Sequence, residues 1–336
     1  MQPIDHRIDR VDRIDRIARR LKFKDLHTFR AAVQLGSMSK AAAEVALTPP
    51  AVTKVIGDME RLLGVKLLER TSQGVAPTAY GEALVSGSLN LFDDIRRTIE
   101  QIEFLADPTV GEVRVNWSAA WHASVLPMVI DRVSRQYPRI VMHFSTSSSA
   151  HEQLKALQDR AFDLCFNRLE AQPEEVLEQE ALFDDPMVIV TSRDNTRLRG
   201  RNITLAQLMD AAWCLPSGST MATGHLARAF QSAGLSFPHI SVHCLSMELQ
   251  TALVASGRFL TVLPASYLRF SAVKASLRIL PVALGIDPPP VGIVTLKNRA
   301  LSPVANLFVQ TLRAVVKDAK LSRAGMGTAA LRNARA

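Results

Sequence analysis

Apolar side chains recur with the spacing of α-helices from about residue 24 onward. The first predicted helix ends near Gly36. The face that it buries consists of Leu26, Phe29 and Val33. Ser37 or Ser39 can cap the next helix, and small side chains at 41–43 let another helix approach closely.

A third helix is predicted to begin at Thr48, because threonine is a common N-cap and Pro49 fits a first turn that needs no amide donor. One face of this helix buries Val52, Ile56, Met59 and Leu63. The opposite face offers Thr48, Pro49, Pro50, Ala51, Thr53 and Lys54. Helix, tight turn and helix is the arrangement that lays a second helix in the major groove of DNA.

A hairpin is predicted directly after this helix. Two short strand patterns, at 64–70 and 75–78, flank a loop with a glycine. A hairpin in this place is a wing, and it brings Arg70 and Gln73 within reach of phosphates or the adjoining minor groove.

From about Ala79 to Asp107 the chain contains no proline, and one set of positions recurs at steps of three and four. That set is Val85, Ser88, Phe92, Ile95, Ile99, Ile102 and Ala106. This spacing is typical of a coiled-coil seam and predicts a long helix that pairs with a second copy of itself. Packing against the chain's own second half is the alternative. Pro108 ends the helix.

Beyond Pro108, strand patterns alternate with helix patterns, which predicts mainly parallel sheets covered by helices. Strands are expected at 112–116, 139–144, 162–167, 187–191, 213–215, 239–244, 259–263 and 291–297. A final helix is expected from Pro303 to about Lys317. The order indicates two α/β lobes, with the chain returning to the first lobe at its end, as in a periplasmic-binding-protein-like clamp.

Ligands of such clamps lie between the lobes, at strand C-termini and helix N-termini, where backbone amides favour anions. The positions that meet this description are Ser118, Ser147, Ser148, Ser149, Asn167, Ser219, Thr220, Met221 and Ser246. Their hydroxyl groups suit a carboxylate or another small anion. The alternative for the serine run at 145–149 is a solvated polar loop.

Net charge adds little to this picture. The chain has 336 residues and a formal charge of +8. Residues 1–22, with seven basic and four acidic side chains, contribute +3, and residues 319–336, with four basic side chains, contribute +4. The segment 23–80 has seven basic and five acidic side chains and contributes only +2. DNA binding is therefore predicted from pattern and not from charge.

Several other functions are disfavoured. No apolar run approaches the ~20 residues that span a bilayer, and the start of the chain is charged, so we expect a cytoplasmic protein without a membrane partner. The three cysteines, Cys165, Cys214 and Cys244, lack metal-binding spacing and are expected to be reduced and buried.

Catalysis is also disfavoured. Residues 216–221 lack the glycines of a nucleophile elbow, and no phosphate-binding glycine motif occurs. His239 and His243 lie in a strand pattern without a third ligand, so we expect neither a metal site nor a cofactor.

The N-terminal third resembles the LysR family of bacterial transcriptional regulators. The resemblance rests on GSMSKAAAE at 36–44, LTPPAVTKVI at 47–56, LLGVKLLER at 62–70 and PTAYG at 77–81. Asp163-Leu164, Leu263-Pro264 and 301–303 extend it less specifically into the second half. It departs from the family at Pro49, where relatives usually carry a glutamine that can contact bases.

The resemblance implies an α+β multidomain architecture: an N-terminal winged helix-turn-helix, a long linker helix and a C-terminal α/β two-lobed domain. We divide the chain into an amphipathic extension at 1–21, a DNA-binding domain at 22–80, a linker helix at 81–108, an effector domain at 109–320 and a basic tail at 321–336. Lobe I spans about 109–184 and 285–320, and lobe II about 185–284.

The resemblance further implies a homodimer or tetramer that reads two-fold DNA sites under the control of a small-molecule effector, with RNA polymerase as a further partner. The residues expected to contact DNA are Ser39, Lys40, Thr48, Pro49, Pro50, Ala51, Thr53, Lys54, Arg70 and Gln73. Those expected at the dimer seam are Val85, Phe92, Ile95, Ile99 and Ile102.

Two other classes remain as alternatives. An architectural DNA-binding protein with a vestigial sensor domain would coat DNA uniformly instead of protecting a discrete operator. A transport-type solute-binding protein would need an export signal and would not need the first eighty residues.

Overall fold

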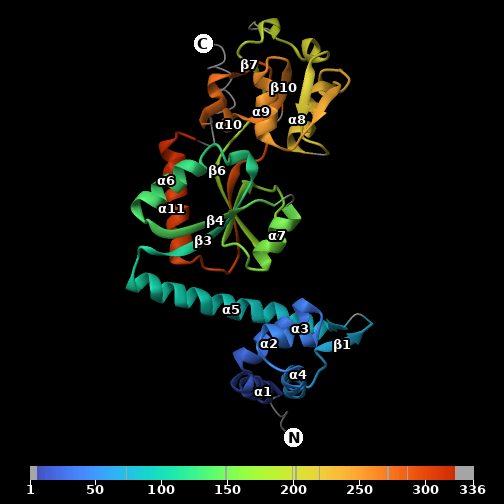
Figure 1. Cartoon of the computed structure of the whole chain (residues 1–336), viewed down its shortest axis with the longest axis vertical. Helices are drawn as coiled ribbons and strands as arrows, with labels where there is room; N and C mark the ends of the chain where they lie inside the picture. The colour runs from blue at the N-terminus through green and yellow to red at the C-terminus, as the bar shows by residue number, and fades with distance from the viewer. Residues whose placement is uncertain are drawn as a thin grey trace. The chain divides into compact units, whose positions relative to one another are not determined.

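A computed structural model of the chain describes residues 6–321 apart from 73, 148, 149, 199, 201, 202, 219, 271 and 286 (Figure 1). The chain divides into two compact units, residues 1–96 and 97–336. Four residues of the predicted sites, Gln73, Ser148, Ser149 and Ser219, lie outside the described residues, as does the basic tail beyond residue 321.

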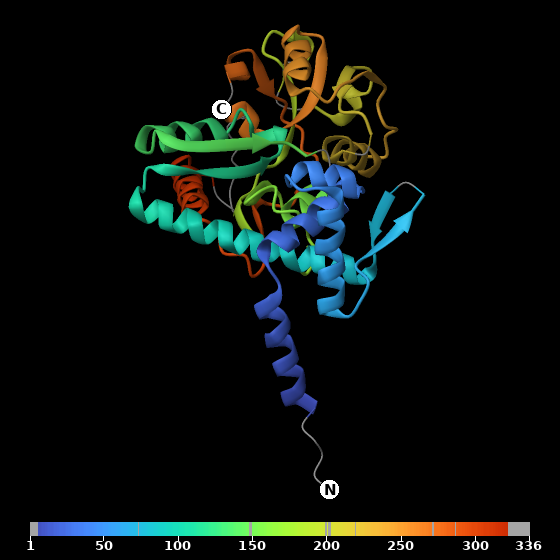
Figure 2. The same cartoon turned by 60° about the horizontal axis from the view of Figure 1, so that its bottom comes forward.

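The first unit is built from helices and one hairpin. Its elements are α1 (His6–Arg20), α2 (Phe23–Leu35), α3 (Met38–Glu44), α4 (Pro49–Leu63), β1 (Leu68–Thr71), β2 (Gly74–Pro77) and the start of α5 (Ala79–Ala106). Figure 2 shows α1 outside the group formed by α2, α3 and α4. Side chains from these three helices and from Leu67 form the core of the unit.

The helix ends in this unit lie where local chemistry predicts them. Gly36 ends α2 in the left-handed conformation, with φ of 60°. The Ser37 hydroxyl accepts a hydrogen bond from the Lys40 N–H and caps α3. Thr48 caps α4, and Pro49 occupies its first turn. The predicted helix–turn–helix is confirmed.

Close backbone contacts hold the wing in place. The Val75 N–H donates to the Gly36 carbonyl at 3.0 Å. A Cβ on Gly74 would lie 2.1 Å from that same carbonyl oxygen, so no larger residue fits there without movement. On the other side of the hairpin, the Glu60 carboxylate accepts from the Leu67 N–H at 2.9 Å. The end of α4 therefore fixes the position at which β1 begins.

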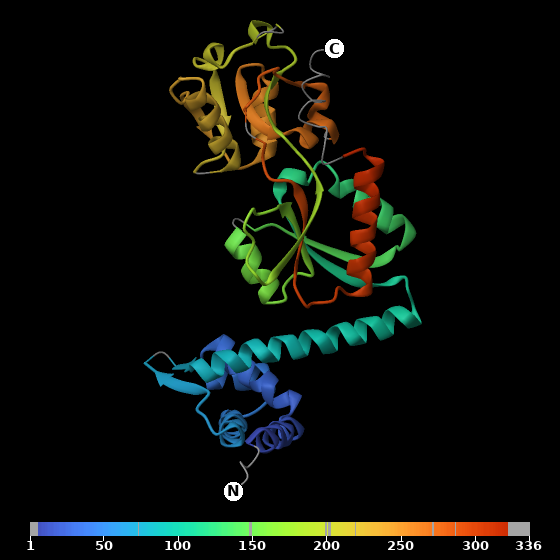
Figure 3. The ribbon, with the colours of Figure 1, turned by 180° about the vertical axis from the view of Figure 1, so that it is seen from behind.

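Lobe I of the second unit is a five-stranded sheet in the order β4-β3-β5-β12-β6. Its strands are β3 (Val110–Trp117), β4 (Arg139–Ser145), β5 (Leu164–Arg168), β6 (Leu177–Phe183) and β12 (Val291–Leu296). Its helices are α6 (Leu126–Gln136), α7 (Ala150–Gln158) and α11 (Pro303–Asp318). Figure 3 shows α11 and α6 on one side of this sheet and α7 on the other.

Lobe II is a second five-stranded sheet, in the order β11-β7-β10-β8-β9. Its strands are β7 (Met187–Ser192), β8 (Ala212–Leu215), β9 (Ile240–His243), β10 (Phe259–Pro264) and β11 (Leu277–Ile279). Its helices are α8 (Met221–Ser232), α9 (Met247–Ala255) and α10 (Ala265–Phe270). No helix in the described part of the chain is long and apolar enough to cross a membrane.

The expectation of mainly parallel sheets needs a correction. β12 pairs antiparallel with both β5 and β6, and β7 pairs antiparallel with both β10 and β11. β7 and β12 are the first strands after the chain crosses into a lobe, so each runs away from the crossing while the other strands of its sheet run toward it. Strands β6 and β11 and helix α10 were not predicted from the sequence.

Candidate DNA-reading face and effector domain

One face of α4 packs into the core while the other stays open. Val52, Ile56 and Met59 are buried. On the opposite face Thr48, Pro49, Pro50, Thr53 and Lys54 are exposed and Ala51 is half-buried. The packing that orients the helix therefore leaves free the face predicted to read DNA.

Two internal hydrogen bonds fix the side chains at the start of α4. The Thr48 Oγ1 accepts from the Ala51 N–H at 3.4 Å. The Thr53 Oγ1 donates to the Pro49 carbonyl at 3.0 Å, so its proton is used within the helix and its oxygen and methyl group remain for other contacts. Lys54 supplies an exposed positive charge beside them.

The remaining predicted DNA contacts come from α3 and the wing. Ser39 and Lys40 are exposed in the first turn of α3, and Arg70 is exposed on β1. The turn between α3 and α4 is tight, because the Leu47 N–H donates to the Ala42 carbonyl and Ala46 takes a φ of 52°. This turn joins α3 to α4, so the predicted contact residues of both helices belong to the same helix–turn–helix.

The connection from α4 to the wing depends on Glu60, which the sequence did not single out. Burial would raise the pKa of this carboxyl, but the Lys66 ammonium at 2.6 Å and the amides of Leu67 and Leu68 bind its charged form and lower the pKa instead. Thr78 completes the connection, because its hydroxyl donates to the Lys66 carbonyl at 2.7 Å and accepts from the Gly81 N–H at 3.2 Å.

The predicted dimer seam divides into two parts. Val85 and Phe92 pack against the core of the first unit. The Phe92 ring lies 6.0 Å from the Phe23 ring, and the Arg30 guanidinium lies over it at 5.1 Å. Val85 and Phe92 therefore make packing contacts within their own chain. In contrast Ile95, Ile99 and Ile102 are 39%, 50% and 62% exposed.

In lobe I the predicted effector residues lie together at one edge of the sheet. Ser118, Ser147 and Asn167 follow or end β3, β4 and β5. Parallel pairing of β3 with both neighbours places the three strand ends side by side. This edge faces the crossing into lobe II, because β6 runs in the same direction and leads to β7.

Polar side chains at this edge are partly paired with one another. The buried Asn116 Nδ2 donates to the Ser147 Oγ at 2.7 Å, and the Asn167 Nδ2 donates to the Gln153 Oε1 at 2.9 Å. The Asn116 Oδ1 and the Trp117 Nε1 are buried without a hydrogen-bond partner among the described residues. Unsatisfied polar groups of this kind cost about 1–3 kcal/mol each. The Trp117 indole belongs to the apolar core of lobe I, so of these two groups only the Asn116 amide, which contacts Ser147, lies among the predicted effector residues.

In lobe II the predicted residues are helix caps. The Thr220 hydroxyl accepts from the Thr223 N–H at 3.3 Å at the start of α8. The Ser246 hydroxyl accepts from the Leu249 N–H at 3.2 Å and donates to the Glu248 carboxylate at 2.8 Å at the start of α9. Met221 is 38% exposed. Both helix starts follow strands that run toward lobe I, so they lie at the edge that faces it.

A buried polar network holds the two lobes at their crossings, and the sequence reasoning missed it. Asp185 is fully buried in the first crossing. Its carboxylate accepts from the Trp121 Nε1 at 2.8 Å in lobe I and from the Ser266 hydroxyl at 2.7 Å in lobe II. The Ser266 N–H adds a bond of 2.9 Å. The signal available was a doubled aspartate at 184–185 between two strand patterns.

Arg168, at the end of β5, joins the same network. Its guanidinium donates to the carbonyl of Asp185 at 2.5 Å and to the carbonyl of Pro289 at 2.9 Å, which lie in the first and the second crossing. It also lies over the Trp121 ring at 5.6 Å. Burial lowers the pKa of Arg168, and the opposite charges of Asp185 and Asp184 counteract that effect.

His225, on α8, is 2% exposed, and its Nδ1 has no hydrogen-bond partner among the described residues. Burial lowers its pKa, and the positive charges of Arg228 and Arg168 lower it further. The imidazole is thus held in its neutral form within the effector domain.

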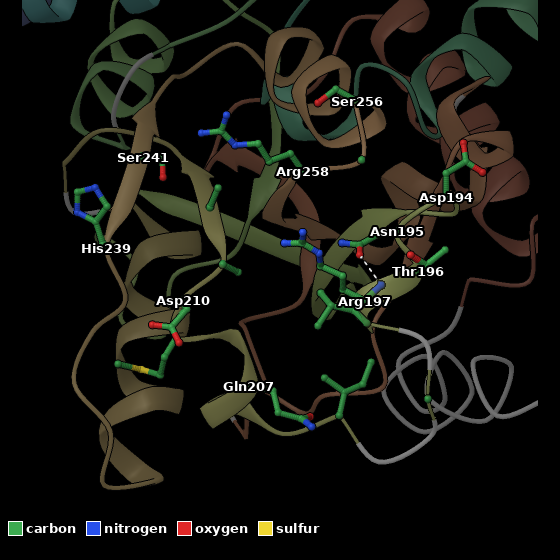
Figure 4. A pocket seen from close by; sticks show the side chains of 17 residues that line it. Asp194, Asn195, Thr196, Arg197, Gln207, Asp210, His239, Ser241, Ser256 and Arg258 are labelled. Atoms are coloured by element: carbon green, nitrogen blue, oxygen red, sulfur yellow. Dashed lines mark hydrogen bonds between the residues drawn. The ribbon is translucent and has the colours of Figure 1, made fainter.

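A hollow of about 1310 Å³ lies in lobe II, away from the predicted effector edge (Figure 4). It is lined by residues from the end of β7 and the starts of β8, β9 and β10, among them Arg197, Asp210, His239 and Arg258. None of the predicted effector residues that the structure describes lines it. Two acidic side chains, Asp194 and Asp210, offset its two arginines.

The cysteines match the expectation in part. Cys165 and Cys214 are buried, Cys244 is half-buried, and none of the three forms a disulfide. Burial raises the pKa of the Cys165 thiol to about 12, so this thiol is unreactive at neutral pH. The described residues contain no group of three or more side chains suited to hold a metal ion.

Comparison with known proteins identifies both halves of the chain. Residues 23–82 match the family described as "Bacterial regulatory helix-turn-helix protein, lysR family", and residues 106–317 match the one described as "LysR substrate binding domain". The HTH-type transcriptional regulator GbpR of Azospirillum brasilense is 27% identical over 312 residues, which cover 91% of this chain and 89% of that protein. TdcA of Escherichia coli (strain K12) is 29% identical over 246 residues, which cover 72% of this chain and 77% of that protein.

The fold agrees with these matches. A full-length OxyR variant from Pseudomonas aeruginosa superposes with a TM-score of 0.60 at 20% identity, over 88% of this chain and 95% of that one. The relatives are named as transcriptional regulators, and the matched domains cover the reading face and both lobes. The chain therefore belongs to the LysR family and is a LysR-type transcriptional regulator with a helix-turn-helix DNA-binding domain and an effector-binding domain.

Proposed function

We propose that the chain is a cytoplasmic, sequence-specific regulator that reads paired DNA half-sites with the exposed face of α4. The main support for this proposal is the packing of α4: Val52, Ile56 and Met59 are buried in the core, whereas Thr53 and Lys54 are exposed. A small anion bound between the lobes controls the regulator. Its binding changes the angle between the lobes, and through it the geometry of the DNA and the contact with RNA polymerase.

A footprint on the intergenic DNA upstream of the chain's own gene tests the reading face. We expect a discrete protected region with two-fold symmetry at physiological salt and with nonspecific competitor present. Joint substitution of Thr53→Ala and Lys54→Ala removes a hydroxyl and a charge from the face and should weaken operator binding at least tenfold.

The matched control for that experiment is Arg61→Ala on the same helix. Arg61 is exposed in the last turn of α4 and pairs with Asp58. Its loss should leave operator affinity within about twofold. Full protection by the double variant would contradict the assigned face. Uniform coating of all DNA by the wild type would favour the architectural alternative.

The effector proposal is supported by the lobe I edge, where Asn116 and Ser147 are joined and buried polar atoms remain without partners among the described residues. A panel of small carboxylates and phosphates, screened by thermal melting of the whole chain, should contain a ligand that raises the melting temperature. Asn167→Ala should reduce that rise, and Ser134→Ala, at an exposed position on α6, should not. If the ligand raises the melting temperature of Asn167→Ala as much as that of the wild type, Asn167 is not part of the effector site.

The dimer proposal is supported by the exposed isoleucines of α5. Ile99→Glu with Ile102→Glu places charges on a surface that we expect a second copy to cover, so the mass in solution should fall to that of a monomer. Gln101→Glu, at an exposed position on the same helix, is the control. Light scattering that gives the same mass for the wild type and both variants would exclude this seam.

A further inference from the structure

The starts of helices α8 and α9 are neighbours in lobe II. β8 and β9 are paired parallel strands, and each leads through a short loop into one of these helices. Paired strands lie about 4.8 Å apart, so the two helix starts share one stretch of the edge that faces lobe I. Two bare helix starts at one place would form a strongly positive site, but these two carry opposite chemistry.

The start of α8 keeps amide donors available. Thr220 caps the helix by accepting from the Thr223 N–H, and no acidic residue lies in the first turn. The N–H groups of Met221 and Ala222 donate to no acceptor among the described residues. Amide donors at a helix N-terminus bind an anionic group such as a carboxylate.

His225 lies one turn further along α8 and is also unsatisfied. Its side chain is buried, and its Nδ1 has no hydrogen-bond partner in the part of the chain that the structure describes. Burial lowers the pKa of the imidazole, and the positive charges of Arg228 and Arg168 lower it further. Since Arg168 ends β5 in lobe I, both lobes contribute basic groups near α8.

The start of α9 presents a negative charge. Glu248 is exposed in its first turn. The residue's own N–H and the Ser246 hydroxyl, which donates at 2.8 Å, lower the pKa of its carboxyl, and the charge of His122 in lobe I acts in the same direction. Glu248 therefore stays charged at neutral pH. At this end of the site a ligand's carboxylate is repelled, whereas a cationic group is attracted.

Apolar surface flanks Glu248. Leu245, in the loop before α9, is 71% exposed, and Leu249, directly after Glu248, is 48% exposed. Covering such surface with an apolar group of a ligand gains about 25 cal/mol per Å². The surroundings of Glu248 therefore favour a ligand whose remaining part is apolar.

We propose that the effector is an amino acid with an apolar side chain. This inference rests on the proposed control by a ligand between the lobes. The carboxylate is the anionic group and binds the amides at the start of α8. The ammonium group binds the Glu248 carboxylate, and the side chain covers Leu245 and Leu249. An acid without the ammonium group leaves the charge of Glu248 unpaired, so it binds less tightly.

Matched pairs of ligands test the inference. Thermal melting of the whole chain with each protein amino acid identifies the ligand, and titration calorimetry compares the ligand with its deaminated counterpart. Leucine is compared with 4-methylpentanoate, and phenylalanine with 3-phenylpropanoate, because each pair differs only in the ammonium group. The amino acid should bind the wild type about tenfold more tightly than its counterpart.

Variants of Glu248 connect this preference to its carboxylate. Glu248→Gln removes the charge and keeps the shape, so it should weaken binding of the amino acid about tenfold and leave that of the deaminated acid unchanged. Glu248→Lys should reverse the preference. Glu175→Gln, at an exposed position before β6 and at the end of that strand away from lobe II, is the control and should keep the wild-type preference. Thermal melting without ligand shows whether the variants are folded.

Equal affinity of the wild type for both members of each pair would overturn the inference and leave an anionic effector standing. A preference for the amino acid that persists unchanged in Glu248→Gln would overturn it as well. If no amino acid binds, the inference fails, and the panel of carboxylates and phosphates then decides whether the proposed effector control stands.

Discussion

At the scale of single residues, the polar side chain of Asp185 joins the two lobes of the effector domain. It is fully buried and accepts hydrogen bonds from Trp121 and Ser266, which belong to different lobes. A buried acceptor with partners on both sides of a crossing joins elements that share little apolar core. The carboxylate thus takes the place of packing where the two sheets meet.

Replacement of Asp185 by alanine leaves the Trp121 and Ser266 donors buried and unsatisfied. We expect the free energy of unfolding to fall by about 3 kcal/mol in urea titrations followed by circular dichroism. Asp131→Ala is the control, because Asp131 pairs with Arg135 on the exposed side of α6 and should cost less than about 1 kcal/mol. Equal losses for the two variants would show that the network is not stabilising.

His225 predicts a pH dependence at the same scale. The folded chain holds its pKa below the usual 6.5, so the unfolded chain binds protons more readily as the pH falls. The free energy of unfolding should therefore be insensitive to this group above about pH 6.5 and should decrease below it. His225→Gln should flatten the decrease, whereas His151→Gln, at an exposed position on α7, should not. Identical pH profiles for the wild type and His225→Gln would refute this assignment.

At the scale of elements, the wing depends on a glycine and α4 does not. A Cβ on Gly74 would lie only 2.1 Å from the Gly36 carbonyl oxygen, and the φ of 138° at Gly74 is unfavourable for other residues. Gly57 is inside α4, and a Cβ there meets no atom within 4 Å. The two glycines therefore predict opposite responses to the same substitution.

Gly74→Ala should destabilise the first unit by more than about 1 kcal/mol and weaken operator binding, because it displaces the hairpin from α2. Gly57→Ala should stabilise it by up to about 1 kcal/mol, since alanine is the better helix former. Thermal melting of the full chain with operator-binding titrations measures both effects. A stabilised Gly74→Ala would mean that the Gly36 contact is absent in solution.

The helices and strands also show which features can be predicted from local sequence patterns. The helix starts at Thr48 and Pro303 and the helix end at Gly36 were predictable, because each depends on interactions within a few residues. β6 and β11 were not, since their pairing partners β12 and β7 lie far away in the sequence. The seam of α5 was predicted as one stripe, but Val85 and Phe92 turned out to pack within the first unit.

At the scale of the whole molecule, the proposed effector response requires the two lobes to move, and Arg168 connects the two crossings between them. Its guanidinium binds the carbonyls of Asp185 and Pro289, so both connections are held by one side chain. We expect this clamp to limit the motion of lobe II against lobe I, because each crossing is a short segment outside the sheets. A change of lobe angle would then have to strain or release these bonds.

Arg168→Met removes the clamp while it keeps an unbranched, apolar stem. Hydrogen exchange should increase at the amides of Asp185 and Met187 in the first crossing and at the amide of Leu169, which donates to the Pro290 carbonyl of the second crossing, and it should stay unchanged in β3. Arg313→Gln is the control, since Arg313 binds Glu180 on the exposed surface, away from both crossings. Unchanged exchange at both crossings in Arg168→Met would show that the carbonyl contacts do not restrict them.

The sequence by itself determined the identity of the reading domain and the existence of two lobes. Caps, turns and apolar periodicity act over a few residues, and the motif at 36–81 is long enough to identify its family. Only the tertiary structure decided the strand directions, the division of the α5 seam and the meeting of Trp121, Arg168, Asp185 and Ser266 at the crossings. Such contacts join residues tens of positions apart, and their energy depends on burial that no local pattern records.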